Sequence, residues 1–348
     1  MNVKWNKLLA LTLGLSLLAA CGPKEAQPTP TPETTASPEV TATPAPEGTA
    51  VNVAMLKGPT GLGAARLMAQ SDAGETVNDY TFSVLAEPAQ AVAALTSGEV
   101  DIAAVPTNMA SILYHKPDED IQLLALNTLG VLYILERGDT VNSLADLAGK
   151  TVYATGQGAN PEYALNYLLR QNGLEPGEDV TIEWKATGDE VAAGMTAGEI
   201  DLAMLPVPAA TSVLIQNQDV RKAVSLTEEW EKAGADGVLT MGCVVARAEF
   251  AQAHPEAVDT FLTEYGTSIA YMSDEANRDD AAALAETYGI VPKAAVAKKA
   301  LPDANLCFIT GDDMIDGIQG YYEVLFAADP ASIGGSIPDG AFYYHAKS

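Results

Sequence analysis

The chain has 348 residues, and 46 acidic residues against 19 lysines and arginines give it a formal net charge of −27. This charge excludes the basic footprint of a nucleic-acid-binding protein and argues against docking on anionic lipid through a basic face. Because 48% of the residues are hydrophobic and only 19% are charged, the chain can build a large core. Its length favours two lobes or two domains over one small domain.

Residues 1–20 are predicted to be a lipoprotein signal peptide. Lys4 and Lys7 precede an apolar run that is too short to span a bilayer comfortably. The run ends in LAAC at residues 18–21, which resembles the bacterial lipobox; the alternative is an ordinary secretory signal with an incidental cysteine. The lipobox implies that Cys21 carries the lipid, such as palmitate, and becomes the mature N-terminus. We therefore expect an extracytoplasmic protein that is lipid-anchored to the cell membrane.

Residues 21–50 are predicted to be the lipidated cysteine and a linker. Residues 22–50 contain seven prolines and seven threonines, with Val40 as the one large apolar side chain. Such a segment cannot bury enough apolar surface to fold, and proline favours extended polyproline II. The folded body is therefore expected from residue 51 onwards.

The strongest internal signal is a repeat with an offset of 100 residues. AALTSGEVDIAAVPTNMAS at 93–111 aligns with AGMTAGEIDLAMLPVPAAT at 193–211. Each copy predicts a helix that ends at Gly98 or Gly198, then a short buried strand, a turn with proline and a second helix. Upstream, the strands expected at 51–56 and 81–87 correspond to those expected at 151–155 and 181–187.

The repeat predicts two βαβαβ units and hence an α/β fold. Parallel strands with right-handed helical crossovers give an open sheet, and ligands bind beyond its carboxyl strand ends. The apolar stretch 123–137 predicts a strand that leaves lobe one for lobe two, and 237–250 predicts the returning strand. We assign 51–129 and 245–348 to lobe one, and 130–244 to lobe two. Helices are expected in the last part of lobe one at 255–272, 279–288, 292–300 and 312–328.

The lipobox, the spacer and the duplicated α/β unit with two crossover strands resemble a solute-binding lipoprotein of an ABC importer. The segments SLADLAGKTVYATGQGANPEYALNYLLRQNGL (143–174) and SGEVDIAAVP (97–106) are similar to the nitrate, aliphatic-sulfonate and thiamine-precursor group of these proteins. The resemblance implies a type II periplasmic-binding fold that closes on one small-molecule ligand. It also implies a monomer, with an ABC-transporter permease and its ATPase as partners. A sulfonate, nitrate or a thiamine-precursor pyrimidine all stay open as the ligand.

Four turns at carboxyl strand ends carry the candidate ligand contacts. Each precedes a helix N-terminus with unpaired N–H groups, and their Gly, Thr, Gln and Asn residues offer backbone approach and uncharged hydrogen bonds. The predicted ligand-binding residues are Lys57, Gly58, Thr60, Gly61, Thr107, Asn108, Thr155, Gly156, Gln157, Asn160 and Val207. Each turn has a plain structural alternative, a tight strand-to-helix connection. Asp101 and Asp201 are expected to make structural hydrogen bonds, and the hinges are expected at 127–130 and 241–242.

The sequence shows no catalytic motif. GxSxG and HExxH are absent, no histidine lies in a glycine-rich turn, and no Cys/His spacing fits a metal. We therefore expect no enzyme activity, catalytic residue, metal or cofactor. Two alternatives stay open: an enzyme of pyrimidine or menaquinone-precursor synthesis on the same fold, and a ligand-sensing lipoprotein without a transporter. Cys243 and Cys307 lie in apolar surroundings and are expected to be buried free thiols, although an extracytoplasmic disulfide is chemically allowed.

Overall fold

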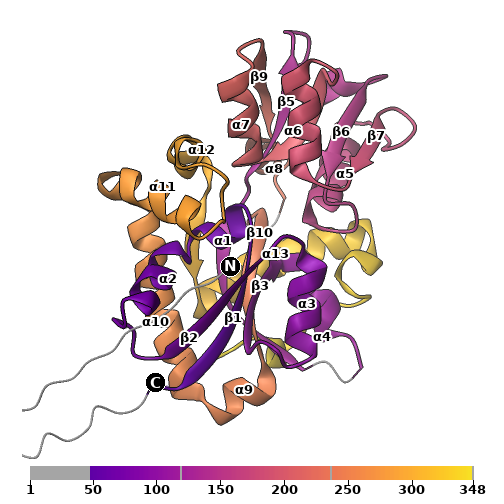
Figure 1. The fold of residues 1–348 in the computed structure, drawn as a ribbon. Coiled ribbons are helices and arrows are strands. Elements are labelled where there is room, and N and C mark those ends of the chain that lie inside the picture. The colour runs from indigo at the N-terminus through magenta and orange to yellow at the C-terminus, as the bar shows by residue number, and fades with distance from the viewer. Residues whose placement is uncertain (1–47, 118–119, 236, 347–348) are drawn as a thin grey trace, which may run out of the picture. The chain divides into compact units, whose positions relative to one another are not determined.

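The computed structural model describes residues 48–117, 120–235 and 237–346. The predicted signal peptide, Cys21 and nearly all of the predicted linker lie outside these residues. The described residues belong to one compact unit. It contains two β-sheets, each flanked by helices (Figure 1).

The first sheet has six strands in the order β11-β4-β10-β3-β1-β2. These strands are β1 (Ala50–Leu56), β2 (Asp79–Leu85), β3 (Ile102–Pro106), β4 (Ile121–Leu129), β10 (Thr240–Arg247) and β11 (Leu306–Ile309). β1 is parallel to β2 and β3, so the carboxyl ends of these three strands meet at one edge of the sheet. β10 is antiparallel to both β3 and β4. We call this sheet and its helices lobe one.

Helices cover both faces of the first sheet. They are α1 (Pro59–Leu62), α2 (Ala65–Asp72), α3 (Pro88–Thr96), α4 (Thr107–Tyr114), α9 (Ala248–Ala253), α10 (Pro255–Ser273), α11 (Arg278–Thr287), α12 (Ala294–Ala300) and α13 (Gly311–Ala328). Along β1, Val53 and Met55 pack with α2 and α10, while Ala54 and Leu56 pack with α3 and α4. Successive strand residues point to opposite faces, so a continuous apolar run buries both.

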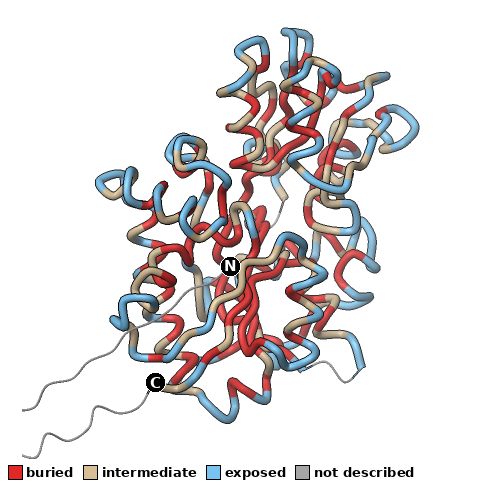
Figure 2. The backbone as a smooth tube through the Cα atoms, viewed as in Figure 1, coloured by how far each residue is buried: buried red, intermediate tan, exposed pale blue. Residues whose placement is uncertain are grey.

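The second sheet has five strands in the order β7-β6-β8-β5-β9, and we call it and its helices lobe two. The strands are β5 (Leu132–Arg137), β6 (Thr151–Thr155), β7 (Thr181–Lys185), β8 (Leu202–Pro206) and β9 (Val220–Ser225). The helices are α5 (Asn160–Gln171), α6 (Gly188–Ala197), α7 (Ala209–Gln216) and α8 (Leu226–Lys232). β6 is parallel to β7 and β8, which repeats the arrangement around β1. Figure 2 shows that the central strands of both sheets are buried and that many of the connecting loops are exposed.

Short 3₁₀ turns complete the two lobes. They are η1 (Leu144–Leu147), η2 (Glu275–Asn277), η3 (Leu301–Asp303), η4 (Pro330–Ile333) and η5 (Gly340–Phe342).

The fold predicted from the repeat, two βαβαβ units joined by two crossings, is confirmed. Gly98 and Gly198 follow equivalent helices, and both have φ of 76°. This left-handed conformation is the one that glycine adopts most readily at a helix end. Equivalent local sequences therefore build equivalent turns in the two lobes.

The crossings differ from the sequence prediction in two details. The stretch 123–137 forms two strands, β4 and β5, one in each sheet. The returning strand β10 pairs within the first sheet from its first residue, since Thr240 pairs with Leu129. Residues 240–244, which we expected in lobe two, therefore lie in the sheet of lobe one. A buried apolar strand fits the interior of either sheet, so its local sequence gives little indication of which sheet it joins.

Both cysteines of the body are free, as predicted; Cys243 is buried as expected, whereas Cys307 is only half-buried. Burial raises the pKa of both thiols, that of Cys307 to about 12. Among the described residues, no group of His, Cys, Asp and Glu could hold a metal ion. No helix within the described ranges is long and apolar enough to cross a membrane.

Candidate functional site

Turns at the carboxyl ends of the parallel strands form the candidate site, because ligands of open α/β sheets bind at such ends. We call them the strand-end turns. They follow β1, β2 and β3 in lobe one and β6, β7 and β8 in lobe two. Their residues are 57–61, 86–90, 107–108, 155–160, 186–190 and 207–209.

The turn after β1 is compact. The Lys57 side chain is exposed, and the Gly58 N–H donates to the carbonyl oxygen of Ile290 at 3.0 Å. Gly58 has φ of 90°, and nothing lies within 4 Å of a Cβ built on it. A Cβ built on Gly61 would lie 1.9 Å from the carbonyl oxygen of Leu56. Gly61 is therefore required by the tight turn itself, whereas Gly58 leaves open space beside the backbone.

Thr60 belongs to a polar cluster beneath this turn. Thr60 is 9% exposed, and its carbonyl oxygen accepts a hydrogen bond from Asn127 Nδ2 at 3.2 Å. Asn127 Nδ2 also donates to the Tyr265 hydroxyl oxygen at 3.0 Å. A Cβ on Gly242 would lie 2.6 Å from Thr60 Cγ2 and 2.7 Å from Asn127 Oδ1. Gly242, which pairs with Pro106 at the carboxyl end of β3, thus makes room for these two buried uncharged side chains.

A second polar cluster joins the two lobes. The Asn108 N–H donates to Asn160 Oδ1, and the Asn160 N–H donates to Asn108 Oδ1, both at 3.1 Å. Asn160 Nδ2 donates to Thr107 Oγ1 at 2.7 Å and to the Met241 carbonyl oxygen at 2.9 Å. The Tyr321 hydroxyl donates to Asn160 Oδ1 at 2.8 Å. We call Thr107, Asn108, Asn160 and Tyr321 the interlobe cluster; all four are buried.

The two asparagines of this cluster cap each other's helices. Asn108 lies in the first turn of α4 and Asn160 in the first turn of α5. Helix-terminal N–H groups have no partner within their own helix and are usually satisfied by a neighbouring side chain. Here the capping side chain comes from the other lobe. Burial raises the pKa of Tyr321, which keeps its hydroxyl protonated and able to donate.

The turns of lobe two combine polar and apolar surfaces. Thr155 is half-buried and Gln157 is exposed. Gly156 has φ of 86°, and a Cβ there would lie 2.6 Å from Pro161 Cγ. Val207 is buried, and its N–H donates to the carbonyl oxygen of Val131 at 3.1 Å. Thr155 and Gln157 therefore carry accessible polar groups of the turn after β6, while Val207, which we predicted as a ligand contact, packs in the core.

The structure thus brings some of the predicted site residues into direct contact and keeps others apart. Thr107, Asn108 and Asn160 bond to one another, whereas no hydrogen bond in the described part of the chain joins turn 57–61 to turn 155–160. Sequence reasoning did not identify Tyr321 as part of the site. Asn127 was named only as a hinge residue, although an asparagine within an apolar strand signals a buried hydrogen-bonding requirement.

Further contacts between the lobes lie beside the crossings. The Lys222 ammonium forms an ion pair with Asp303 and lies 4.3 Å from the centroid of the Tyr133 ring. Asn305 Nδ2 donates to the carbonyl oxygen of Gly130. These contacts connect β9 and the start of β5 to the segment between α12 and β11.

Three arginines lie at the opposite ends of the sheets, each with a carboxylate. Arg247 Nη2 lies 2.8 Å from Asp101 Oδ1, and Arg137 pairs with Asp201 in the equivalent place of lobe two. The backbone N–H of Asn52 also donates to Asp101 Oδ2 at 3.0 Å. The predicted structural hydrogen bonds of Asp101 and Asp201 are therefore confirmed.

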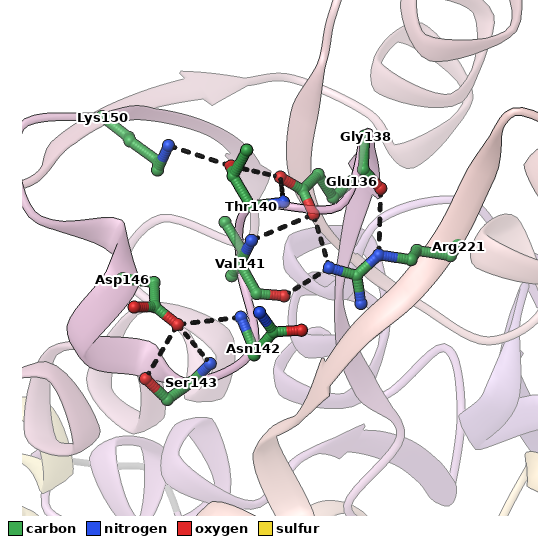
Figure 3. Close-up of polar contacts among 9 residues, drawn as sticks. All are labelled: Glu136, Gly138, Thr140, Val141, Asn142, Ser143, Asp146, Lys150 and Arg221. Carbon is green, nitrogen blue, oxygen red and sulfur yellow. Dashed lines mark hydrogen bonds and ion pairs between the residues drawn. The ribbon is translucent and has the colours of Figure 1, made fainter.

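The third pair joins Glu136 of β5 to Arg221 of β9 beside the loop that follows β5 (Figure 3). Glu136 accepts hydrogen bonds from the Thr140 hydroxyl at 2.6 Å, the Val141 N–H at 3.1 Å and Arg221 Nη2 at 2.7 Å. Burial alone would raise the pKa of Glu136, but these hydrogen bonds and the Arg221 charge together lower it. Asp146 similarly accepts from the N–H groups of the loop before η1. Residues 136–150 thus stabilise the end of lobe two away from the strand-end turns.

Two surface hollows also lie apart from the strand-end turns. One, of about 420 Å³, lies between α5 and α13 and is lined by Tyr167, Arg170 and Glu323, among others. The other, of about 350 Å³, is lined by residues that include Leu262 and Phe308. Neither hollow is lined by a strand-end turn residue.

Comparisons with known proteins agree with this architecture. The E. coli K12 taurine-binding periplasmic protein is 26% identical over 190 residues, which are 55% of this chain and 55% of that protein. The chain thus spans about half the length of this relative. A solved ABC transporter structure from Parabacteroides distasonis has a TM-score of 0.71 at 20% identity, covering 86% of this chain and all of that one. The periplasmic aliphatic sulphonate-binding protein SsuA of E. coli has a TM-score of 0.66 at 18% identity, covering 82% and 94%.

The family scan covers more than half of the chain. The model described as ABC transporter, phosphonate, periplasmic substrate-binding protein matches residues 74–299, a range that includes strands of both sheets and both crossings. Together with the two-sheet architecture, this match shows that the chain belongs to the family of ABC-transporter periplasmic substrate-binding proteins.

Proposed function

We propose that the chain is an extracytoplasmic lipoprotein that captures a small molecule between its two lobes and delivers it to the permease and ATPase of an ABC importer. The observation that carries this proposal is the interlobe cluster, in which strand-end turns from the two repeated halves contact each other directly. Family membership and the taurine-binding relative support the same role. Cys21 is the proposed lipid anchor.

The proposed ligand contacts are five residues of the strand-end turns, all exposed or half-buried except Thr60, which is 9% exposed. They are Lys57, Gly58 and Thr60 in lobe one, and Thr155 and Gln157 in lobe two. Thr60 and Thr155 offer hydroxyl groups, Gln157 offers an amide, and Gly58 allows close approach of the ligand to the backbone. The interlobe cluster positions the two lobes around these contacts.

The proposed mechanism is hinge closure. The lobes rotate about the crossings at 127–130 and 241–242, where a few residues absorb the backbone change. A ligand favours the closed state only through the contacts that it gains with the second lobe. The permease then recognises the closed protein. The candidate ligands are a sulfonate, nitrate or a thiamine-precursor pyrimidine.

A ligand screen, followed by alanine variants of the two threonines of β6, tests ligand capture. The full-length chain is screened by thermal shift against methanesulfonate, nitrate, taurine and a hydroxymethyl aminopyrimidine, since a ligand at a hundredfold excess over its Kd stabilises by about 2.7 kcal/mol. Thr155→Ala removes a hydroxyl at the carboxyl end of β6 and should weaken binding by about tenfold. The control Thr151→Ala removes a hydroxyl at the amino end of β6, away from the strand-end turns. Equal binding by both variants would contradict the proposed site.

Delivery to a transporter is tested separately. A permease and ATPase whose genes adjoin this one, where such genes are found, are reconstituted in proteoliposomes, and ATP hydrolysis is measured with and without the loaded protein. We expect the loaded protein to stimulate hydrolysis. Ligand binding without any stimulation would instead favour a ligand-sensing lipoprotein that works without a transporter.

A further inference from the structure

Thr211, in the first turn of α7, carries a buried hydroxyl group that makes no hydrogen bond. The residue is 5% exposed, and its Oγ1 has no partner among the described residues. A helical threonine often bonds to the carbonyl oxygen four residues before it, here that of Val207, but this bond is not made. Because a buried hydroxyl without a partner costs free energy, it indicates a hydrogen bond to something outside the chain.

The sequence repeat supplies a matched position in lobe one. Ser111 corresponds to Thr211 at the offset of 100 residues and lies in α4, the helix that follows β3. The Ser111 hydroxyl is also buried, but it donates to the carbonyl oxygen of Ile333 at 2.7 Å. Ile333 belongs to η4, in the C-terminal segment that packs against α4. The same repeat position thus holds a hydroxyl that protein satisfies in lobe one and a hydroxyl that stays available in lobe two.

Thr211 lies outside the face of α7 that packs in the core of lobe two. Ala210 and Val213 belong to that core. At 3.6 residues per turn, Thr211 lies about 100° around the helix from Ala210 and about 160° from Val213. The Cα–Cβ bonds of a helix tilt toward its N-terminus, so the Thr211 side chain leans toward the carboxyl end of β8 and the strand-end turn 207–209. The free hydroxyl is therefore placed beside the candidate site.

The backbone at the start of α7 adds two further donors. The N–H groups of Ala210 and Thr211 meet no acceptor within the described ranges of the chain, whereas the next N–H, that of Ser212, donates to the Pro208 carbonyl oxygen at 3.0 Å. The first turn consists of Ala209, Ala210 and Thr211, so no carboxylate in it offsets the positive end of the helix dipole. One turn of α7 thus offers a hydroxyl and two N–H groups to a ligand.

We propose that the start of α7 is a ligand subsite, in which the Thr211 hydroxyl and the N–H groups of Ala210 and Thr211 donate hydrogen bonds to an oxygen-bearing end of the ligand. This proposal rests on the proposed function and adds a subsite to the contacts given there. A carbonyl, carboxylate or other oxygen with free lone pairs fits these donors. An ammonium group does not fit, because it can only donate and would face the positive end of the helix.

Three variants of the full-length chain test this subsite. Thr211→Val replaces the hydroxyl by a methyl group of similar size, and Thr211→Ser keeps the hydroxyl. Ser212→Ala is the matched control, because it removes the neighbouring hydroxyl of α7, whose oxygen accepts from Gln216 Nε2 at 2.8 Å. Methanesulfonate, nitrate, taurine and a hydroxymethyl aminopyrimidine are titrated into each chain by calorimetry. Urea unfolding without ligand measures the stability of each variant.

Thr211→Val should weaken binding of the compound that the wild type binds by about tenfold, and the other two variants should stay within about threefold of wild type. Ligand-free Thr211→Val should be at least as stable as wild type, because an apolar group replaces an unpartnered hydroxyl. Unchanged binding by Thr211→Val would overturn the subsite. So would a loss of its ligand-free stability, which would show that the hydroxyl already has a partner such as a buried water. Both results leave ligand capture intact, whereas failure of all four compounds to bind the wild type would contradict the proposed function and the subsite with it.

Discussion

Replacing Asn160 by alanine removes the central side chain of the interlobe cluster. Its Oδ1 accepts from the Asn108 N–H and the Tyr321 hydroxyl, and its Nδ2 donates to Thr107 Oγ1 and the Met241 carbonyl oxygen. Thr107 keeps a partner, because its hydroxyl donates to a carbonyl oxygen of β10. Three buried groups thus lose their hydrogen bond to Asn160: the Asn108 N–H, the Tyr321 hydroxyl and the Met241 carbonyl oxygen. At about 1 kcal/mol each, the low end for unsatisfied buried groups, Asn160→Ala should destabilise the fold by about 3 kcal/mol.

Urea unfolding of the full-length chain, followed by tryptophan fluorescence, measures this change. Asn172→Ala is the matched control, because Asn172 lies just after the other end of α5 and its Nδ2 makes one local hydrogen bond, to the Leu168 carbonyl oxygen at 2.8 Å. We expect the control to change stability by less than about 1 kcal/mol. If Asn160→Ala cost no more than Asn172→Ala, the reasoning that the cluster holds the lobes together would be refuted.

Three further predictions concern the anchor, the loop of lobe two and the first turn. Cys21→Ser should release the protein from the membrane fraction; a variant that stays bound through a carbonate wash would rule out the lipid anchor. Glu136→Gln should cost about 2 kcal/mol in urea unfolding, because Arg221 loses its charged partner. Since the pKa of Glu136 is lowered in the folded state, its contribution is present above the unfolded value of about 4.3 and is lost as the pH falls through the folded value. The stability difference from wild type should therefore narrow below about pH 4, and a constant difference would contradict this. Gly61→Ala should cost about 2 kcal/mol in the same assay, because its Cβ would overlap the Leu56 carbonyl oxygen; an unchanged urea midpoint would show that the turn is not tight.

Much of the fold was predictable because its signals are local. A buried strand needs a short apolar run, and a helix end needs a residue that tolerates positive φ. The local sequence of each half of the repeat therefore specifies its own strands and helix ends. Gly98 and Gly198 illustrate this, with the same φ in two lobes. The strands β9 and β11 were missed because both are edge strands without a clear alternation of apolar and polar residues.

The candidate site was less predictable, because the partner of a turn residue depends on what the other lobe brings to it. Asn108 and Asn160 are ordinary helix-starting residues in the sequence, and either would suit a ligand contact. Their mutual bonds join positions 52 residues apart and need both crossings to be in place. Tyr321 lies even further along the sequence, 161 residues from Asn160, because α13 follows the last crossing. The sequence thus predicted where polar groups gather, but not which of them would already be satisfied by protein.

The contacts between the lobes differ in strength, and the difference fits rotation about the crossings. Asn160 donates to the Met241 carbonyl oxygen, and Asn305 donates to that of Gly130, so both acceptors lie on or beside the crossing segments. Atoms near a hinge move least when lobes rotate, which lets hydrogen bonds of this kind persist through closure. The side chains of Lys222 and Asp303 are instead 30% and 37% exposed, and an ion pair so accessible to water stabilises little. The proposed hinge closure needs this arrangement: hydrogen bonds that persist near the pivot, and an ion pair that breaks easily where solvent reaches it.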